Sequence, residues 1–566
     1  MAAIKLDVFK GIAPKNDPKI LARGYAQIAS DIDLSSGKIN PLKAPLDSGE
    51  TLTGSDAKTL YSFPTGSTRL WFESTLVKNV VQGPVAGTTE NRTYLTGGLV
   101  PEMTYVSLNT GVSPFPNTVR RLGVPPPVNA PVIGTPSTKT GLPATADADK
   151  TTVAYICTYV TDQHEEGLPS VASGTIDIYY VNQEVTVTVP ASPSITTPAG
   201  APTPNITTVY IYRVATGSTG AAYQFVTSTT PGSTITDGTL QENLGASITS
   251  GNWAPPPPFN TVAVSSTTYQ YDWAYPTGPM VGLTSMANGI MVGFTGKELC
   301  VSEAYRPHAY PESYRLTLDY DIVGLASVGQ SLVVTTKGHP YLVTGSSPNA
   351  LTQTKFELSQ ACVSAQSMVD MGESVMYASP DGLVELASGR ASLVTSDLID
   401  REYWQGLTPS GIHSYYWEGR YIGFHSTGSF IYDPQTKDFT TSTQTATAGF
   451  NVLEEDLLYV VQGTSTVNEW GQGENLTYTW KSSEMMVPKP LSFSAVQVIG
   501  HHSVANPVTL TLTLDGVVLP DISITSSEPV RLAGSSRTYK YEVQVSGTTT
   551  LDSISLGTTV TALGGL

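Results

Sequence analysis

Residues 331–343 read SLVVTTKGHPYLV, and this stretch decides the fold. Two short apolar runs flank the Lys337-Gly338 turn, which is the pattern of two buried antiparallel strands joined by a tight turn. Similar pairs of apolar runs recur along the chain, at residues 289–302, 374–386, 420–433 and 457–469. Their loose period of about 40 to 50 residues is the period of propeller blades. We therefore expect residues 259–480 to form about four or five blades of a β-propeller.

The N-terminal part of the chain offers strands to the same propeller. Residues 59–63 and 69–72 repeat the hairpin pattern of apolar and aromatic runs. We expect residues 1–123 to contribute to the propeller platform, so that segments on both sides of an insertion close it.

Two proline clusters, at residues 125–127 and 255–258, bracket the insertion. Polyproline segments are stiff and cannot join a sheet ladder, so they act as spacers between domains. Between them, residues such as Val185, Val187 and Val189 alternate with polar neighbours, which is strand periodicity. Turn clusters separate these strands at sandwich-like intervals. We expect residues 124–258 to form a fibronectin III-like or immunoglobulin-like β-sandwich.

The last part of the chain also reads as strands. Residues 508–514 alternate strictly between apolar residues and Thr, and an Asp515-Gly516 hairpin signal follows them. We expect residues 481–566 to form a small C-terminal β-sandwich. The predicted fold class is therefore all-β, a β-propeller platform with an inserted sandwich and a terminal sandwich, and the one doubtful helix lies near residues 396–404.

Composition restricts the function. The chain has 30 Lys and Arg residues against 47 Asp and Glu residues, a formal net charge of −17. Because nucleic-acid binding depends on cations that neutralise phosphates, a conventional DNA- or RNA-binding protein is disfavoured. Cys157, Cys300 and Cys362 are too few for a disulfide framework and lie in apolar runs, so we expect buried thiols and a reducing compartment.

The chain carries no pattern of a secretion signal or membrane anchor. Charges interrupt every apolar pair among the first ten residues. No stretch approaches the roughly 18 uninterrupted apolar residues that span a bilayer. We expect neither export by a signal peptide nor anchoring in a membrane.

Catalytic and metal sites find little support. Asp319 and Asp321 would lie about 7 Å apart on one face of a strand, a spacing that suits an inverting glycosidase, although solvated strand-end acids are the commoner explanation. Residues 31–37 place oxygen ligands close together but too few for tight calcium binding. The chain has no Gly-x-Ser-x-Gly elbow and no diagnostic catalytic cysteine. We expect no enzyme activity, no cofactor and no metal.

Clustered aromatic residues offer a binding function instead. Tyr403-Trp404 and Tyr415-Tyr416-Trp417 can stack on sugars or form protein interfaces. The alternative is that they pack propeller blades against one another.

Two stretches carry a family resemblance. The first runs from residue 9 to residue 42, where residues 9–15 read FKGIAPK and residues 29–42 read ASDIDLSSGKINPL, and the second is residues 301–314, which read VSEAYRPHAYPESY. They resemble segments of the tail nozzle proteins, or tail tubular proteins B, of short-tailed bacteriophages. The resemblance implies a homo-hexameric ring in the virion tail, assembled in the bacterial cytoplasm, which encloses the DNA channel below the adaptor and carries fibres or spikes. A wall of net negative charge is compatible with this role, because it lets DNA pass without binding.

The segment at residues 301–314 is also the predicted interface. It is rich in Tyr and Pro and poor in strand alternation, so we expect a loop whose Tyr305, Arg306, His308 and Tyr310 contact a neighbouring subunit. The alternative is that Arg306 ties the loop to its own propeller. Two other functions stay open beside the nozzle: a receptor- or glycan-binding propeller on the virion surface, and a glycan-cleaving enzyme built on Asp319 and Asp321.

Overall fold

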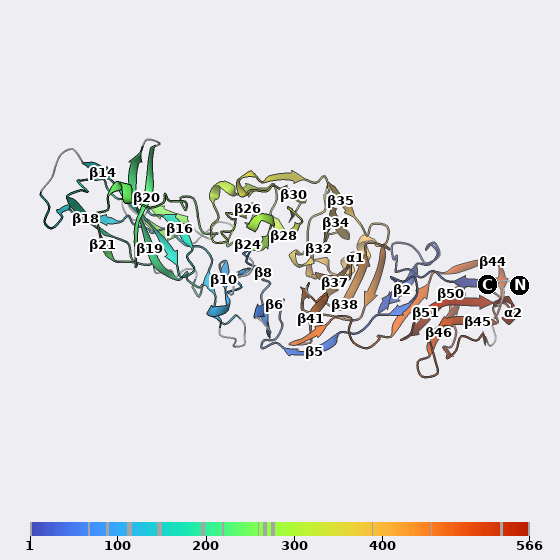
Figure 1. Cartoon of the computed structure of the whole chain (residues 1–566). Helices are drawn as coiled ribbons and strands as arrows, with labels where there is room; N and C mark the ends of the chain where they lie inside the picture. Colours follow the sequence, from blue (N-terminus) through green and yellow to red (C-terminus); the bar gives the residue numbers. More distant parts are fainter. Residues whose placement is uncertain are drawn as a thin grey trace.

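A computed structural model describes residues 3–65, 68–85, 90–109, 116–143, 150–193, 199–217, 220–257, 260–263, 269–272, 278–387, 389–453, 455–532 and 536–563. The molecule is elongated, with an inserted sandwich at one end, a ring of sheets in the middle and a terminal sandwich at the other end, where both chain termini lie (Figure 1). The prediction of an all-β fold is confirmed. In the described part of the chain the α-helices are the short α1 (Arg401–Gly406) and α2 (Val560–Leu563).

Short antiparallel sheets build the ring. The described residues give these sheets, each in strand order: β8 (Asn79–Gln82), β9 (Thr93–Thr96), β10 (Glu102–Thr104) and β11 (Arg120–Arg121); β24 (Val281–Ser285), β25 (Met291–Thr295), β26 (Glu298–Val301) and β27 (Leu316–Thr317); β28 (Ile322–Val328), β29 (Ser331–Thr336), β30 (Tyr341–Thr344) and β31 (Thr352–Lys355); β32 (Val369–Asp370), β33 (Ser374–Ala378), β34 (Leu383–Ala387) and β35 (Arg390–Leu393); β36 (His413–Trp417), β37 (Arg420–His425), β38 (Gly428–Asp433) and β39 (Asp438–Ser442); β40 (Ala448–Val452), β41 (Leu457–Gln462) and β42 (Thr466–Glu469) with β5 (Leu46–Thr51); and β6 (Thr59–Thr65) with β7 (Thr68–Ser74).

Contacts between the first strands close the ring. β24, β28, β32, β36, β40 and β6 contact one another in this order, and β8 contacts β24. Apolar residues of β6 to β9, including Phe63, Phe72 and Leu95, close the remaining gap. The five hairpins predicted between residues 289 and 469 and the one at residues 59–72 are confirmed. The arrangement is propeller-like. Five of its sheets begin in residues 259–480, for which four or five blades were predicted, and the N-terminal strands β6–β11 supply the others.

The sequence did not reveal how the N-terminal strands join the ring. β5 pairs with β42 and so completes a sheet whose other strands lie far along the chain. β5 reads LDSGET, which lacks the alternation that marks a strand, and most of its residues are exposed. A strand of this kind is recognised only by its partner.

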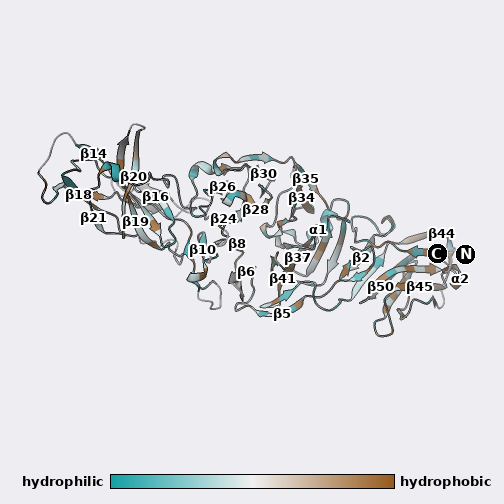
Figure 2. Ribbon diagram, in the orientation of Figure 1, coloured by the Kyte–Doolittle hydropathy of each residue, from teal (hydrophilic) through white to brown (hydrophobic). Residues whose placement is uncertain are grey.

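The inserted sandwich consists of two main sheets and a strand pair. One sheet contains β12 (Val132–Ile133), β13 (Ser137–Thr138), β18 (Gln183–Thr188) and β21 (Thr234–Asp237). The other contains β15 (Tyr155–Thr161), β16 (Glu166–Pro169), β19 (Ile206–Gly217) and β20 (Gly220–Thr229), and β14 (Thr151–Val153) pairs with β17 (Ile176–Ile178). Their inward residues, such as Val185, Val187 and Ile211, form a core separate from that of the ring. Hydrophobic and hydrophilic segments both occur in this sandwich (Figure 2), and along β18 buried Val185 and Val187 flank exposed Thr186.

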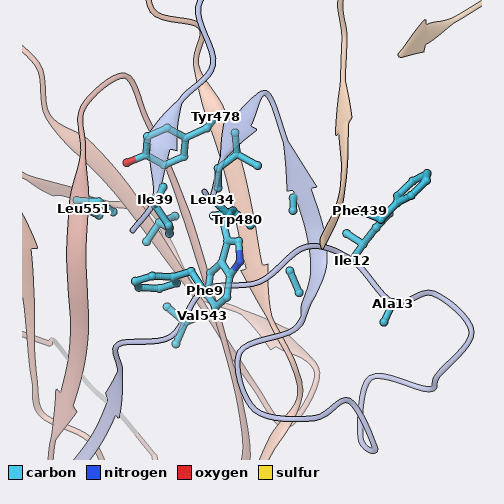
Figure 3. Packing of buried hydrophobic residues seen from close by; sticks show 14 of the residues in the cluster. Phe9, Ile12, Ala13, Leu34, Ile39, Phe439, Tyr478, Trp480, Val543 and Leu551 are labelled. Atoms are coloured by element: carbon cyan, nitrogen blue, oxygen red, sulfur yellow. The ribbon is translucent and has the colours of Figure 1, made fainter. Parts of the chain in front are cut away.

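The terminal sandwich includes the N-terminus. Its first sheet contains β1 (Ala3–Leu6), β51 (Leu551–Gly557), β45 (Ala495–Gly500) and β49 (Val530–Arg531). Its second contains β2 (Ala26–Ser30), β43 (Tyr478–Ser482), β50 (Thr538–Gly547), β46 (Val508–Leu514), β44 (Met485–Leu491), β47 (Val517–Val518) and β48 (Ile522–Ile524). Figure 3 shows Phe9 and Ile39 among Trp480, Val543 and Leu551 in the shared core.

This arrangement differs from the prediction at residues 3–41 and at the boundary at residue 480. β1 pairs within the terminal sandwich, β2 pairs with both β39 of the ring and β43, and β43 at the end of the predicted propeller segment also pairs with β50 of the sandwich. The hydrogen-bond partners of β1 and β2 lie at the opposite end of the sequence, so no local pattern identifies them.

A few shorter elements complete the fold. β3 (Ile32–Asp33) pairs with β4 (Asn40–Pro41), and β22 (Asn260–Ala263) pairs with β23 (Tyr269–Asp272). The 3-10 turns are η1 (Val106–Leu108), η3 (Gln241–Asn243), η4 (Ala287–Gly289), η5 (Glu312–Tyr314), η6 (Pro348–Ala350), η7 (Ala365–Ser367) and η8 (Pro409–Gly411). No helix of the described residues is both long and apolar enough to cross a membrane.

Candidate functional site

The two proline clusters form a joint between the ring and the inserted sandwich. Pro125–Pro127 and Pro255–Pro257 are buried, and a Cβ on Gly123 would lie 2.5 Å from Pro256. The backbone N–H of Met280 donates to the carbonyl of Pro257 over 3.0 Å. The two proline clusters, which were predicted to be spacers between domains, are therefore packed against neighbouring parts of the chain.

The predicted interface segment lies across this joint. Tyr305 and Arg306 are exposed, and Tyr305 is 57% exposed. Tyr305 has a left-handed φ of 57° and donates its N–H to the Gly289 carbonyl over 2.9 Å. The guanidinium of Arg306 lies over the ring of Trp253, 4.9 Å from its centroid, so it contacts the end of the inserted sandwich within the same chain.

His308 and Tyr310 are buried in the same joint. His308 Nε2 lies 3.1 Å from the carbonyl oxygen of Glu166, and burial lowers the pKa of His308 to about 3. Tyr310 donates its N–H to the Ala254 carbonyl over 2.6 Å, and burial raises the pKa of its phenol. The side chains of His308 and Tyr310 are therefore enclosed by other residues of the same chain. The predicted contact with a neighbouring subunit stays a prediction for Tyr305 and Arg306.

A hollow of about 270 Å³ opens at this joint, and we call it the junction pocket. Its walls come from the ring, from the turn before β16 and from the predicted interface segment. They consist of Gln82–Val85, Asn91, Arg92 and Tyr94, then Gln163–Glu165, then Tyr305–His308.

Glu165 is the buried acid of the junction pocket. Its Oε1 lies 3.7 Å from Arg92 Nη1 and 3.9 Å from His308 Nδ1, yet it accepts no hydrogen bond from the described residues. Burial raises the pKa of Glu165 to about 7. Arg92 Nη2 donates to the side-chain oxygen of Gln163 over 2.9 Å, which holds the guanidinium at the pocket wall. The pocket therefore combines a hydrogen-bond donor held in place, the Arg92 guanidinium, with an acceptor that receives no hydrogen bond, Glu165 Oε1.

Sequence reasoning found only part of this pocket. It singled out Tyr305, Arg306 and His308 but not Glu165. Arg92 was missed because nothing in the sequence brings residue 92 beside residue 165. The signal that was available is the Glu165-Glu166 pair in a strand turn, where an acid next to a buried strand end is unusual.

The acids proposed for a glycosidase lie elsewhere. Asp319 and Asp321 are in the bend between β27 and β28 rather than on one face of a strand, which corrects the prediction. The Tyr341 hydroxyl and Lys355, at 2.8 and 3.1 Å, hold the pKa of Asp319 below its usual range. Asp321 pairs with Lys337 over 3.1 Å. Each carboxylate thus has its own lysine.

Asp31 has a structural use. Its carboxylate accepts hydrogen bonds from the Ser442 hydroxyl at 2.7 Å and from the N–H and hydroxyl of Thr443, both at 3.0 Å. These bonds join the N-terminal segment to the end of β39. Within the described ranges no group of three or more His, Cys, Asp or Glu residues could hold a metal ion.

The aromatic residues mostly pack inside the ring. Trp404 lies edge-on to Phe430, Tyr415 is tilted against Phe424, and Trp417 lies edge-on to Trp470. Trp404 and Trp417 are buried, so these two residues pack in the interior, which was the alternative to a binding role. The three cysteines are buried and free, as predicted, and burial raises the pKa of Cys157 and Cys300 to about 12.

Comparison with known proteins adds no function. No family model matches the chain, and no curated protein matches it. Among solved structures, the CNH domain of AfRom2 matches with a TM-score of 0.24 and 6% identity over 59% of this chain and 93% of that chain. An exo-β-1,3-galactanase from Phanerochaete chrysosporium matches with a TM-score of 0.18 and 12% identity, covering 90% of this chain and 100% of that chain. The extracellular domain of a one-component system from B. thetaiotaomicron has a TM-score of 0.20 and 8% identity, over 89% and 96% of the two chains. Likeness at this level has no bearing on what the chain does.

Proposed function

We propose that this chain is a structural virion protein, the nozzle subunit of a short phage tail, which assembles into a ring around the DNA channel. One observation supports the proposal: both segments that carry the family resemblance lie at joints between modules. Residues 9–42 join the ring to the terminal sandwich, and residues 301–314 join the ring to the inserted sandwich.

The position of these segments fits a protein that assembles. Identical subunits close a ring only if each holds its modules at the same angle. Phe9 packs edge-on against Trp480 with ring centroids 5.0 Å apart, and the N–H of Ile12 donates to the Phe439 carbonyl over 2.8 Å. Segments whose role is to fix module positions have no need of catalytic chemistry.

The test is ring formation by the purified full chain. Mass photometry and negative-stain microscopy should show a closed oligomer, of about six subunits by resemblance, with a central channel. The double variant Tyr305→Ala with Arg306→Ala should remain a folded monomer. Tyr310 is left intact because it is fully buried, so its loss would disturb folding itself.

Tyr539→Ala is the matched control, since Tyr539 is an exposed tyrosine on β50 of the terminal sandwich. Rings that form equally in the double variant would remove Tyr305 and Arg306 from the subunit contact. A chain that stays monomeric under all conditions, with or without particle components, would contradict the nozzle proposal.

A second candidate function is recognition of glycans at the virion surface. The observation that favours it is the junction pocket, which Arg306 lines and in which Glu165 Oε1 lies 3.7 Å from Arg92 and accepts no hydrogen bond from the described residues. A glycan array probed with the purified chain tests this function. Specific binding supports it, and a blank array contradicts it.

A further inference from the structure

The inner wall of the junction pocket holds an acceptor that the protein does not use. The side chain of Glu165 is 5% exposed, and its Oε1 accepts no hydrogen bond from the described residues. Leaving a buried acceptor unpaired costs free energy, because the group has lost its hydrogen bonds to water. A ligand that donates a hydrogen bond to this oxygen recovers that loss.

The charges around the pocket select the kind of donor. Arg92 and Arg306 line the pocket together with Glu165. An anion would meet the carboxyl of Glu165, and a cation would meet the two guanidinium groups. A hydroxyl donates to the carboxyl and accepts from a guanidinium at the same time, so it satisfies both groups.

Tyr305 adds an aromatic surface at the rim. Its ring packs beside Gly289, where a Cβ would lie 2.5 Å from a ring carbon, while 57% of the residue remains exposed. The face of an aromatic ring carries negative charge and attracts the weakly positive C–H groups of a sugar ring. An aromatic face beside groups that bind hydroxyls is suited to a sugar.

The backbone around the pocket is held in unusual conformations. Asn91, His164 and Tyr305 have φ angles of 42°, 60° and 57°, one in each of the three walls. Left-handed backbone at non-glycine residues is uncommon and is found at ligand sites. The volume of about 270 Å³ is at the small end for ligand pockets, so it fits one sugar unit better than a long chain.

We propose that the junction pocket binds one uncharged sugar residue of a glycan, with Glu165 and Arg92 hydrogen-bonded to its hydroxyls and Tyr305 stacked on its ring. This proposal rests on the recognition function suggested above and gives it a site and a ligand class. It is independent of ring formation.

The experiment measures binding of small probes to the full chain by saturation-transfer NMR and calorimetry at neutral pH. The probes are the methyl glycosides of glucose, galactose and N-acetylglucosamine, with glucuronate, glucosamine and inorganic phosphate as charged competitors. We expect at least one neutral glycoside to bind and the charged probes to bind at least about tenfold more weakly, a difference of about 1.4 kcal/mol.

Two variants locate the site. Tyr305→Ala and Glu165→Gln should each weaken binding of the neutral glycoside about tenfold, and Tyr539→Ala should leave it unchanged. Because Glu165 is buried, circular dichroism must first show that Glu165→Gln is folded. If it is not, the exposed Tyr305 decides the outcome.

Each other result overturns the proposal in its own way. Tighter binding of phosphate or of a charged sugar would show that the pocket selects ions. Equal binding by the wild type and both variants would place glycan recognition elsewhere on the chain and leave the recognition function standing. No binding of any neutral glycoside would contradict both the sugar site in the junction pocket and the recognition function.

Discussion

The chain joins its modules in two different ways. At the joint between the ring and the terminal sandwich, β2 pairs with both β39 and β43, so one hydrogen-bonded sheet runs from one module into the other. At the joint between the ring and the inserted sandwich, the described contacts are packed prolines, loop hydrogen bonds and a pocket with a buried acid. The first joint merges two modules, whereas the second holds one module against another.

The physical difference lies in what must break for each joint to open. Opening the first joint exposes residues of a large apolar cluster and breaks the pairing of β2 with β39 and β43. Opening the second joint exposes fewer apolar residues and returns Glu165 and His308 to water, which both groups favour in their charged forms. We therefore expect the ring and terminal sandwich to unfold together and the inserted sandwich to behave separately.

The largest expected effect comes from Trp480→Ala. Trp480 is 1% exposed, packs against Phe9 and donates its indole N–H to the Lys10 carbonyl over 3.2 Å. Removing a buried Trp costs about 3–5 kcal/mol, and here the loss falls on the joint. Calorimetry should show the ring and the terminal sandwich melting together at a lower temperature. A melt in which only the terminal sandwich shifts would show that the two modules are not coupled, and Tyr539→Ala supplies the unshifted control.

The next effect comes from Asp31→Asn. Asn tolerates the left-handed φ of 54° at this position but cannot match the carboxylate that three donors bind. Hydrogen bonds to charged groups contribute about 1.5–3 kcal/mol, so we expect a loss of about 2 kcal/mol in denaturant titrations. Millimolar calcium should leave the melting temperature of the wild type unchanged. Calcium stabilisation that disappears in Asp31→Asn would show an ion site instead.

A pH-dependent effect is expected at the joint with the inserted sandwich. Burial raises the pKa of Glu165 from 4.5 to about 7, so its contribution to stability is present below pH 4.5 and is lost as pH rises to about 7. Burial lowers the pKa of His308 from 6.5 to about 3, so its contribution is present above pH 6.5 and is lost as pH falls toward 3. Between about pH 4.5 and 6.5 the two slopes oppose each other.

Glu165→Gln removes the pH dependence of stability that Glu165 contributes. The variant should match the wild type at pH 4 and exceed its stability at pH 8, by at most on the order of 3 kcal/mol. Thermal melts of both proteins across this range measure the difference, with Glu242→Gln at an exposed position of the same module as the control. A difference that is constant with pH would mean that Glu165 ionises normally in the folded chain.

The smallest expected change is in the inserted sandwich after excision. Residues 128–254 contain almost the whole of its apolar core, from which only Val124 is lost. Expressed alone, this segment should melt cooperatively and give a β-type circular dichroism spectrum. A random-coil spectrum would show that the sandwich depends on the ring, and the two joints would then be alike.

The hairpins were predictable from the sequence because their signal is local. Residues 331–343 carry both strands and the turn between them, and the same holds for the other blade hairpins. The alternating run at residues 508–514 forms β46, and the Asp515-Gly516 turn joins it to β47. Between the proline clusters lie β12 to β21, and in the described residues these strands pair only with one another.

The joints and the pocket were not predictable, because their partners are distant in sequence. β1 pairs with β51 and β5 pairs with β42, and neither short strand has a pattern that identifies its partner. The junction pocket combines Arg92, Glu165 and Tyr305, which only the folded chain brings together. Asp319 and Asp321 were placed in a strand by their alternate spacing, but a bend before β28 turns them toward separate lysines.

Native-state hydrogen exchange, read peptide by peptide in low denaturant, tests the difference between the joints most directly. We expect β2, β39 and β43 to open with the same free energy, because they form one ladder. Residues 161–166 and 305–308 should open at a lower free energy, before any of these strands. If β2 exchanges earlier than β39 and β43, or if the junction pocket segments are as protected as the ladder, the account of two unlike joints is contradicted.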